Sequence, residues 1–173
     1  SPVTIMLPRH AEIWLLDYLR SVARARHESG RRQGVVAILF AIADHYEPLH
    51  GDVSDEVGRR RVETWLERLP LMATPFVDAD GRHPQHTFFF PIEQYRPELV
   101  SPLATLCEQG FGEVDVHLHH DNDSAEHLRE QLEGFTRTLH DRHGLLSQDG
   151  TGKIRYGFVH GNWALDNSLP DRR

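Results

Sequence analysis

Histidine and aspartate gather at the ends of the apolar runs of this chain. The sequence contains 13 histidines among 173 residues, and most runs end in polar segments that contain them. These segments are Asp44-His45-Tyr46-Glu47, Pro91-Ile92-Glu93, His117-Leu118-His119-His120-Asp121 and His160-Gly161-Asn162-Trp163. Imidazole nitrogens and carboxylate oxygens are the donor atoms with which proteins bind zinc and related divalent cations. The pattern therefore predicts a metal site.

The segment after Val114 has the alternation of a β-strand. Its apolar side chains fall on one face and its polar ones on the other, the polar set being Asp115, His117, His119 and Asp121. Two imidazoles with carboxylates leave coordination positions open for water, which is typical of hydrolysis or of non-haem iron chemistry. We expect a divalent ion, zinc, held by Asp44, His117, His119 and Asp121.

The elements that position these residues alternate along the chain. Apolar runs predict strands at about residues 35–43, 86–90, 114–119 and 154–160. Amphipathic patterns predict helices between them and an N-terminal helix over about 11–28. The first run is continuously apolar, which is typical of a parallel strand covered on both faces. This order predicts an α/β fold with parallel strands and right-handed crossovers.

Helix ends are marked by capping residues and prolines. Ser54 is expected to cap the helix after the first strand, and Pro70 to stop it. Ser101-Pro102 has the pattern of the next helix start. Asp123 and Glu126 have the spacing of a capping box before the last helix. These signals leave residues 70–85 as a loop.

In parallel α/β folds, ligands bind at the carboxyl ends of the strands, where the polar segments of this chain lie. Besides the metal ligands, this edge would present groups for proton transfer and substrate binding. We assign Asp44, His45 and His160 to catalysis, and His120, Asn162 and Trp163 to the substrate. His120 also remains a candidate for proton transfer or for orienting the ligands.

Composition excludes several other classes of protein. With 19 Lys+Arg against 26 Asp+Glu, the net charge of −7 argues against nucleic acid as a partner. No apolar run approaches the roughly 18 residues of a membrane span, and no segment resembles a signal peptide. The single cysteine, Cys107, excludes an internal disulfide and a thiolate zinc site. These features favour a cytoplasmic protein without a membrane partner.

The order of the segments resembles the NodB-like polysaccharide deacetylases, carbohydrate esterase family four in the broad sense. The matching segments are an apolar strand ending in Asp, a Thr-Phe-Phe strand, a Glu-Val-x-x-His strand and an aromatic, Gly-containing strand end. Here they are residues 38–44, 87–90, 113–121 and 156–163, and the resemblance covers about residues 35–168. It implies a distorted (β/α) barrel of the TIM-barrel-like type.

The resemblance also implies a function. In this family one Asp and two His hold a divalent metal, a neighbouring Asp is the general base, and an acetyl group is removed from a carbohydrate. This chain has Asp44-His45 where the family has two aspartates, so Asp44 is expected as ligand or base. Asp121 stands where the family has its second ligand histidine, and His160-Gly161-Asn162-Trp163 replaces an Arg-Pro-Pro segment.

Two other functions remain open. One is a metal-dependent phosphoesterase or decarboxylase on a related barrel, using the same cluster. The other is a non-catalytic protein, because four strands do not close a (β/α) barrel, which needs about eight. We expect a single domain over residues 1–173, with 1–34 as an N-terminal helix and connector, and a barrel truncated after four strands. Its open sheet edges predict a homodimer, or completion by further strands.

Overall fold

A computed structural model describes residues 11–29, 38–120 and 123–161 of the chain. The chain divides into two compact units, residues 1–39 and 40–173. In the first unit, α1 (Ala11–Ser29) confirms the predicted N-terminal helix. Expectations about residues 35–37, Asp121, Asn162 and Trp163 lie outside the described residues. None of the described helices has the length and apolar character needed to cross a membrane.

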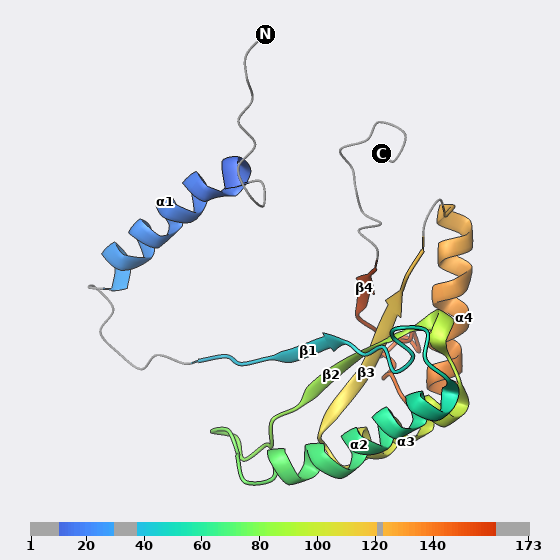
Figure 1. Cartoon of the computed structure of the whole chain (residues 1–173). Coiled ribbons are helices and arrows are strands. Elements are labelled where there is room, and N and C mark those ends of the chain that lie inside the picture. The colour runs from blue at the N-terminus through green and yellow to red at the C-terminus, as the bar shows by residue number, and fades with distance from the viewer. Residues whose placement is uncertain (1–10, 30–37, 121–122, 162–173) are drawn as a thin grey trace. The chain divides into compact units, whose positions relative to one another are not determined.

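The second unit contains four parallel strands in a curled half-barrel sheet (Figure 1). In order across the sheet they are β1 (Ile42–His45), β2 (His86–Pro91), β3 (Gly112–Leu118) and β4 (Phe158–His160). Every neighbouring pair is parallel. The predicted α/β class with parallel strands and intervening helices is confirmed.

Three helices and the core lie on one face of this sheet (Figure 1). They are α2 (Asp55–Ala73), α3 (Pro97–Glu108) and α4 (Ala125–His143). Strand residues that point to the helices are buried, among them Phe88, Phe90, Val114 and Val116. They pack with helix side chains such as Val62, Leu99, Leu103 and Leu139. The alternation of β3 therefore leaves its other face for polar residues, among them Asp115 and His117.

The helix boundaries differ from the predicted ones where proline is involved. Ser54 caps α2 as expected, but the helix passes Pro70 and ends when Thr74 N donates to Pro70 O. Helix α3 begins at Pro97 instead of Pro102, because Pro97 already fills the first helical position, which needs no N–H donor. Helix α4 is capped by Ser124, whose hydroxyl accepts from His127 N. The Asp123 side chain is thus left for other contacts.

Two strands are shorter than predicted because their partners limit them. The register pairs Ile42 with His86, the first residue of β2, so no strand residue lies beside the chain before Ile42. Ile38, Leu39 and Phe40 are correspondingly exposed instead of covered on both faces. At the other edge, Ile154 makes an isolated antiparallel bridge with Gln148, and β4 begins only at Phe158.

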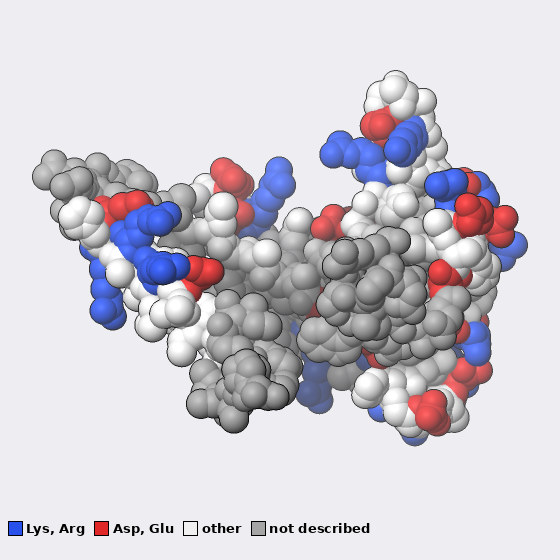
Figure 2. Space-filling model, turned by 90° about the horizontal axis from the view of Figure 1, so that it is seen from above, with Lys and Arg blue, Asp and Glu red and all other residues white. Residues whose placement is uncertain are grey.

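The surface of the second unit carries a group of exposed apolar side chains as well as charges. Leu71, Met72, Phe76 and Val77 at the end of α2 are each more than half exposed, like Phe40 before β1. In the view of Figure 2, positive and negative side chains are interspersed over the described surface. Strands β1 and β4 form the two edges of the sheet.

A short 3-10 helix joins the sheet to α3. This element, η2 (Ile92–Gln94), follows β2 directly and places Glu93 and Gln94 at the carboxyl end of the sheet. The Gln94 side chain accepts a hydrogen bond from Leu49 N at 2.8 Å. This contact ties the loop after β1 to the end of β2, beside the polar residues described next.

Candidate metal centre

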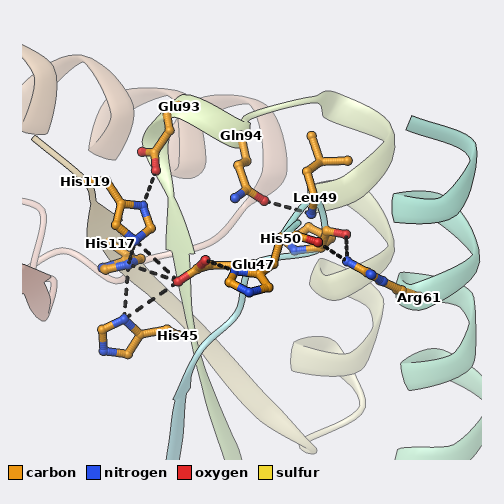
Figure 3. A network of polar contacts seen from close by, with 10 residues as sticks. His45, Glu47, Leu49, His50, Arg61, Glu93, Gln94, His117 and His119 are labelled. Carbon is orange, nitrogen blue, oxygen red and sulfur yellow. Dashed lines mark hydrogen bonds and ion pairs between the residues drawn. The ribbon is translucent and has the colours of Figure 1, made fainter. Parts of the chain in front are cut away.

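Three side chains from β1, the loop after it and β3 converge at the carboxyl end of the sheet (Figure 3). They are His45, Glu47 and His117, whose potential ligand atoms all lie within 4.8 Å of one another. His45 ends β1, and Glu47 follows two residues later on the same side of the chain. His117 lies in β3 and is completely buried.

The separations between these atoms suit a bound cation. His45 Nδ1 lies 3.1 Å from His117 Nε2, and Glu47 Oε1 lies 3.5 Å from His117 Nε2. Metal–ligand bonds of about 2.0–2.1 Å in a tetrahedral zinc site place neighbouring ligand atoms about 3.3 Å apart. The third separation, from His45 Nδ1 to Glu47 Oε1, is 3.9 Å. The group therefore has the spacing of ligands around one ion.

A fourth side chain borders the same point. His119 Nε2 lies 3.2 Å from His117 Nε2 and 3.4 Å from Glu47 Oε1 (Figure 3). Both predicted histidines of the third strand are thus brought together, as their shared strand face requires. Their rings pack edge to face, with centroids 4.4 Å apart.

The second ring nitrogen of His117 determines where its proton lies. His117 Nδ1 donates a hydrogen bond to the backbone carbonyl of Val159 in β4, at 2.8 Å. A carbonyl only accepts, so neutral His117 carries its proton on Nδ1 and its lone pair on Nε2. That lone pair faces His45, Glu47 and His119. This backbone contact is of the kind that orients histidine ligands in metal sites.

Burial favours the neutral form of His117. Removal from water lowers the pKa of His117 below its ordinary value, and the neighbouring His45 and His119 act in the same direction. A neutral imidazole is the form that binds a metal. The carboxylate of Glu47 adds the negative charge that a divalent cation needs, and only 16% of its side chain is exposed.

The loop after β1 holds Glu47 in place. Arg61 of α2 donates to the carbonyls of Pro48 and His50, at 2.9 Å each. The second carboxylate oxygen, Glu47 Oε2, lies 3.1 Å from His50 Nδ1. These contacts orient Oε1 toward the histidines (Figure 3).

Asp44 is not brought into this ligand group. It precedes His45 and therefore points to the opposite face of β1, where Asp44 Oδ1 lies 3.1 Å from His86 Nε2. That pair lacks hydrogen-bond geometry, and Tyr46 Oη is also buried without a partner in the described part of the chain. Asp44, Tyr46 and Trp65 line a cavity of about 220 Å³ that also touches His45 and Glu47. Asp44 thus lies beside the centre without facing it.

His120 and His160 form a separate pair. His120 Nε2 lies 3.0 Å from His160 Nδ1, and His120 Nδ1 lies 3.4 Å from Asp123 Oδ2. Burial, with His120 and His117 nearby, lowers the pKa of His160 below its ordinary value. The pair is contributed by β4 and by the segment after β3, so it lies next to the strand that carries His117. Asp121, Asn162 and Trp163 lie outside the described residues.

Two carboxylates at the centre were not predicted as site residues. Glu47 shares its side of the chain with His45 by the same alternation that pairs His117 with His119, which was an available signal. Glu93, which contacts His119 Nδ1, lies in a 3-10 turn whose direction no periodicity indicates. His45, expected in proton transfer, lies among the potential ligands instead.

Comparison with known proteins found no matching family model, curated protein or solved structure. Functional assignment therefore depends on the chemistry of the site. Histidine nitrogens with one carboxylate suit zinc, iron, cobalt or nickel, whereas calcium and magnesium prefer oxygen ligands alone. The donor set fits a divalent transition metal.

Proposed function

We propose that this chain is a metal-dependent hydrolase whose centre is formed by His45, Glu47 and His117. The observation that supports this most directly is the convergence of their ligand atoms within 4.8 Å at the carboxyl end of a parallel sheet. Ligand sites of parallel α/β folds form at this edge. Zinc is the ion we propose, because two imidazoles and a carboxylate are a common catalytic zinc set.

Each residue of the centre has a distinct part in this proposal. His45 Nδ1, His117 Nε2 and Glu47 Oε1 would hold the ion, with Val159 O fixing the orientation of His117. A divalent ion in such a site supplies a Lewis acid that polarises a carbonyl and lowers the pKa of water to about 7. Asp44 points to the opposite face of β1, toward His86, and we give it no part in the proposed reaction.

We leave His160 out of the proposed centre, because it pairs with Leu118 and so shares the helix side of the sheet, opposite His117. His160 Nδ1 contacts His120 Nε2, and His120 is held on its other side by Asp123. His45 contributes to catalysis in this proposal only by binding the metal.

The substrate class that we propose is an acetylated carbohydrate. It is supported by the resemblance of residues 35–168 to NodB-like deacetylases, in which an acetyl group leaves a sugar nitrogen or oxygen. A phosphate ester is the second substrate class, because the same donor set suits phosphoester hydrolysis. The two classes share the centre and differ only in the products that they release.

One experiment tests both the metal and the reaction. The full chain is purified without added metal, analysed for bound zinc, iron, cobalt and nickel, and then loaded with zinc. Loaded protein is incubated with acetylated chitooligosaccharides and, in parallel, with a phosphate monoester. The proposal is supported if the wild-type chain binds nearly one metal ion per molecule and releases acetate from the substrate. Both properties should disappear in His117→Ala.

The control for this experiment is His27→Ala, because His27 is an exposed histidine of α1 that is not in the candidate ligand group. It should retain both metal and acetate release. Phosphate release without acetate release would favour the phosphoesterase. A wild-type chain that binds none of these metals would refute the proposed function altogether.

A further inference from the structure

Glu93 contacts the far side of the His119 ring. Its Oε1 accepts a hydrogen bond from His119 Nδ1, while His119 Nε2 faces His117 and Glu47 (Figure 3). We propose that Glu93 is a positioning residue that makes His119 a fourth ligand, giving a centre with three nitrogens and one oxygen. This inference rests on the proposed metal site and deepens it.

The contact with Glu93 determines which ring nitrogen of His119 carries a proton. An ionised carboxylate only accepts hydrogen bonds, so the contact with Glu93 places a proton on His119 Nδ1. Neutral His119 then carries its lone pair on Nε2. His117 has the same arrangement, with Nδ1 donating to Val159 O. Both Nε2 lone pairs therefore point at the same region.

Two such lone pairs repel each other unless something positive lies between them. His117 Nε2 and His119 Nε2 are 3.2 Å apart, and neither has a proton to offer the other when both rings are neutral. A cation bound to both removes the repulsion, and 3.2 Å is close to the separation of about 3.3 Å expected for two ligands of one zinc ion. The tautomers of the two histidines thus favour a shared ion.

The backbone of Gly161 closes the other side of the His119 ring. A Cβ atom on Gly161 would lie 2.2 Å from His119 Cδ2, so only glycine leaves room for this ring position. Gly161 N in turn donates to Leu118 O at 2.9 Å, which fixes the backbone there. His119 is therefore held from two directions, although a quarter of its side chain is exposed.

The chemistry of this donor set identifies the class of cation. Three imidazole nitrogens and one carboxylate favour zinc, cobalt or nickel over magnesium and calcium. Hydrogen-bonded partners of histidine ligands usually contribute 10–100-fold to metal affinity. Glu93 should therefore matter for binding although it lies outside the ligand set.

The test measures metal affinity in a double-mutant cycle. Zinc binding to the metal-free full chain is measured by chelator competition in wild type, Glu93→Ala, His119→Ala and the double variant. Glu93→Ala should weaken binding by about 10–100-fold, and His119→Ala by at least as much. Because Glu93 acts through His119, the double variant should bind no more weakly than His119→Ala alone.

Three further measurements separate positioning from a structural role. Glu93→Gln retains an oxygen acceptor for His119 Nδ1 and should recover part of the lost affinity. The cobalt-loaded wild type should change its visible absorption when His119 is replaced, since losing a nitrogen ligand alters the ligand field. Glu130→Ala, which removes an exposed carboxylate of α4, should bind zinc like wild type.

Failure of this inference can be distinguished from failure of the proposed function. A wild-type chain without affinity for zinc or cobalt would overturn both. Tight binding by wild type with unchanged affinity in Glu93→Ala would overturn this inference alone. The inference would also be overturned if the losses of zinc affinity in the two single variants added up in the double variant. Additivity would mean that Glu93 does not act through His119.

Discussion

His45 Nδ1 lies 3.1 Å from His117 Nε2, although the two residues are 72 positions apart and β2 lies between their strands. The contact is made on the face of the sheet opposite the helices, where β1 and β3 approach each other because the sheet curls (Figure 1). The ring centroids are 4.3 Å apart. This relationship, with Glu47 beside it, is the basis of the predictions about metal binding.

Replacing His45 by alanine should lower zinc affinity at least tenfold. The substitution removes a ligand atom, while half of the His45 side chain is exposed and contributes little to the core. The free energy of unfolding of the metal-free variant should stay within about 0.5 kcal/mol of the wild-type value, as for most surface substitutions. Chelator competition and urea unfolding measure the two quantities. Equal zinc affinity in wild type and variant would remove His45 from the centre.

Replacing Gly161 by alanine should displace the His119 ring. The new methyl group would lie 2.2 Å from the ring, which must move away from the metal. We expect roughly tenfold weaker zinc binding, comparable to losing a hydrogen-bonded partner of a ligand. Gly134→Ala is the matched control, since its Cβ would meet nothing within 4 Å. That control should bind zinc normally and gain up to about 1 kcal/mol of stability from helix propensity.

The stability of the metal-free protein should fall as the pH drops from 7.5 to 5. Burial lowers the pKa of His143 below its ordinary value, and Arg142 acts in the same direction. The unfolded chain therefore takes up a proton near pH 6.5 that the folded protein still rejects, which favours unfolding below that pH. The stabilising contribution of neutral His143 is therefore present above pH 6.5 and is lost as the pH falls.

Comparison with His143→Gln isolates this contribution. His143 Nε2 lies 3.0 Å from Tyr95 Oη, and His143 Nδ1 lies 3.2 Å from Ser101 Oγ, so the ring links α3 to α4. Urea unfolding at both pH values should show a smaller pH-dependent loss in His143→Gln than in wild type. An equal loss in the two proteins would mean that His143 does not titrate as inferred.

The isolated chain should self-associate. Strands β1 and β4 are sheet edges. Leu71 in the last turn of α2 and Phe76 just after this helix are 75% and 65% exposed. Edge strands and apolar patches both promote association. Light scattering coupled to size exclusion should give a mass above 19.9 kDa that rises with concentration.

A charged double variant tests whether the exposed apolar side chains mediate this self-association. Leu71→Lys with Phe76→Lys should shift the mass toward the monomer, whereas Thr151→Lys, in an exposed turn, should not. A constant mass of 19.9 kDa for wild type at all concentrations would contradict the prediction.

Periodicity in the sequence was sufficient to predict most of the fold. Alternating strand and helix patterns predicted the parallel sheet, and the shared face of His117 and His119 brought two site residues together. Strand lengths were mispredicted because a strand extends only where a neighbour pairs with it, as the register of Ile42 with His86 shows. Hydropathy carries no information about that partner.

The differences between the predicted site residues and the observed cluster have a similar origin. Residue type favours Asp44 as a ligand, whereas strand alternation turns it toward His86 and brings His45 and Glu47 to the side of His117. Glu93 depends on the path of η2, which only the packing of the folded chain determines. Residue type predicted that histidines and carboxylates would gather at this edge of the sheet, and the tertiary structure determines which of them come together.

The short length of β1 would give an ion bound at the proposed centre a role in strand alignment. β1 has only four residues, and a slip of one residue against β2 would turn His45 to the helix side and Asp44 to the other. Such a slipped sheet could not bring His45 and Glu47 to His117. A bound ion would therefore stabilise the native alignment selectively. Metal availability during folding would then govern the fraction of chains that reach this alignment.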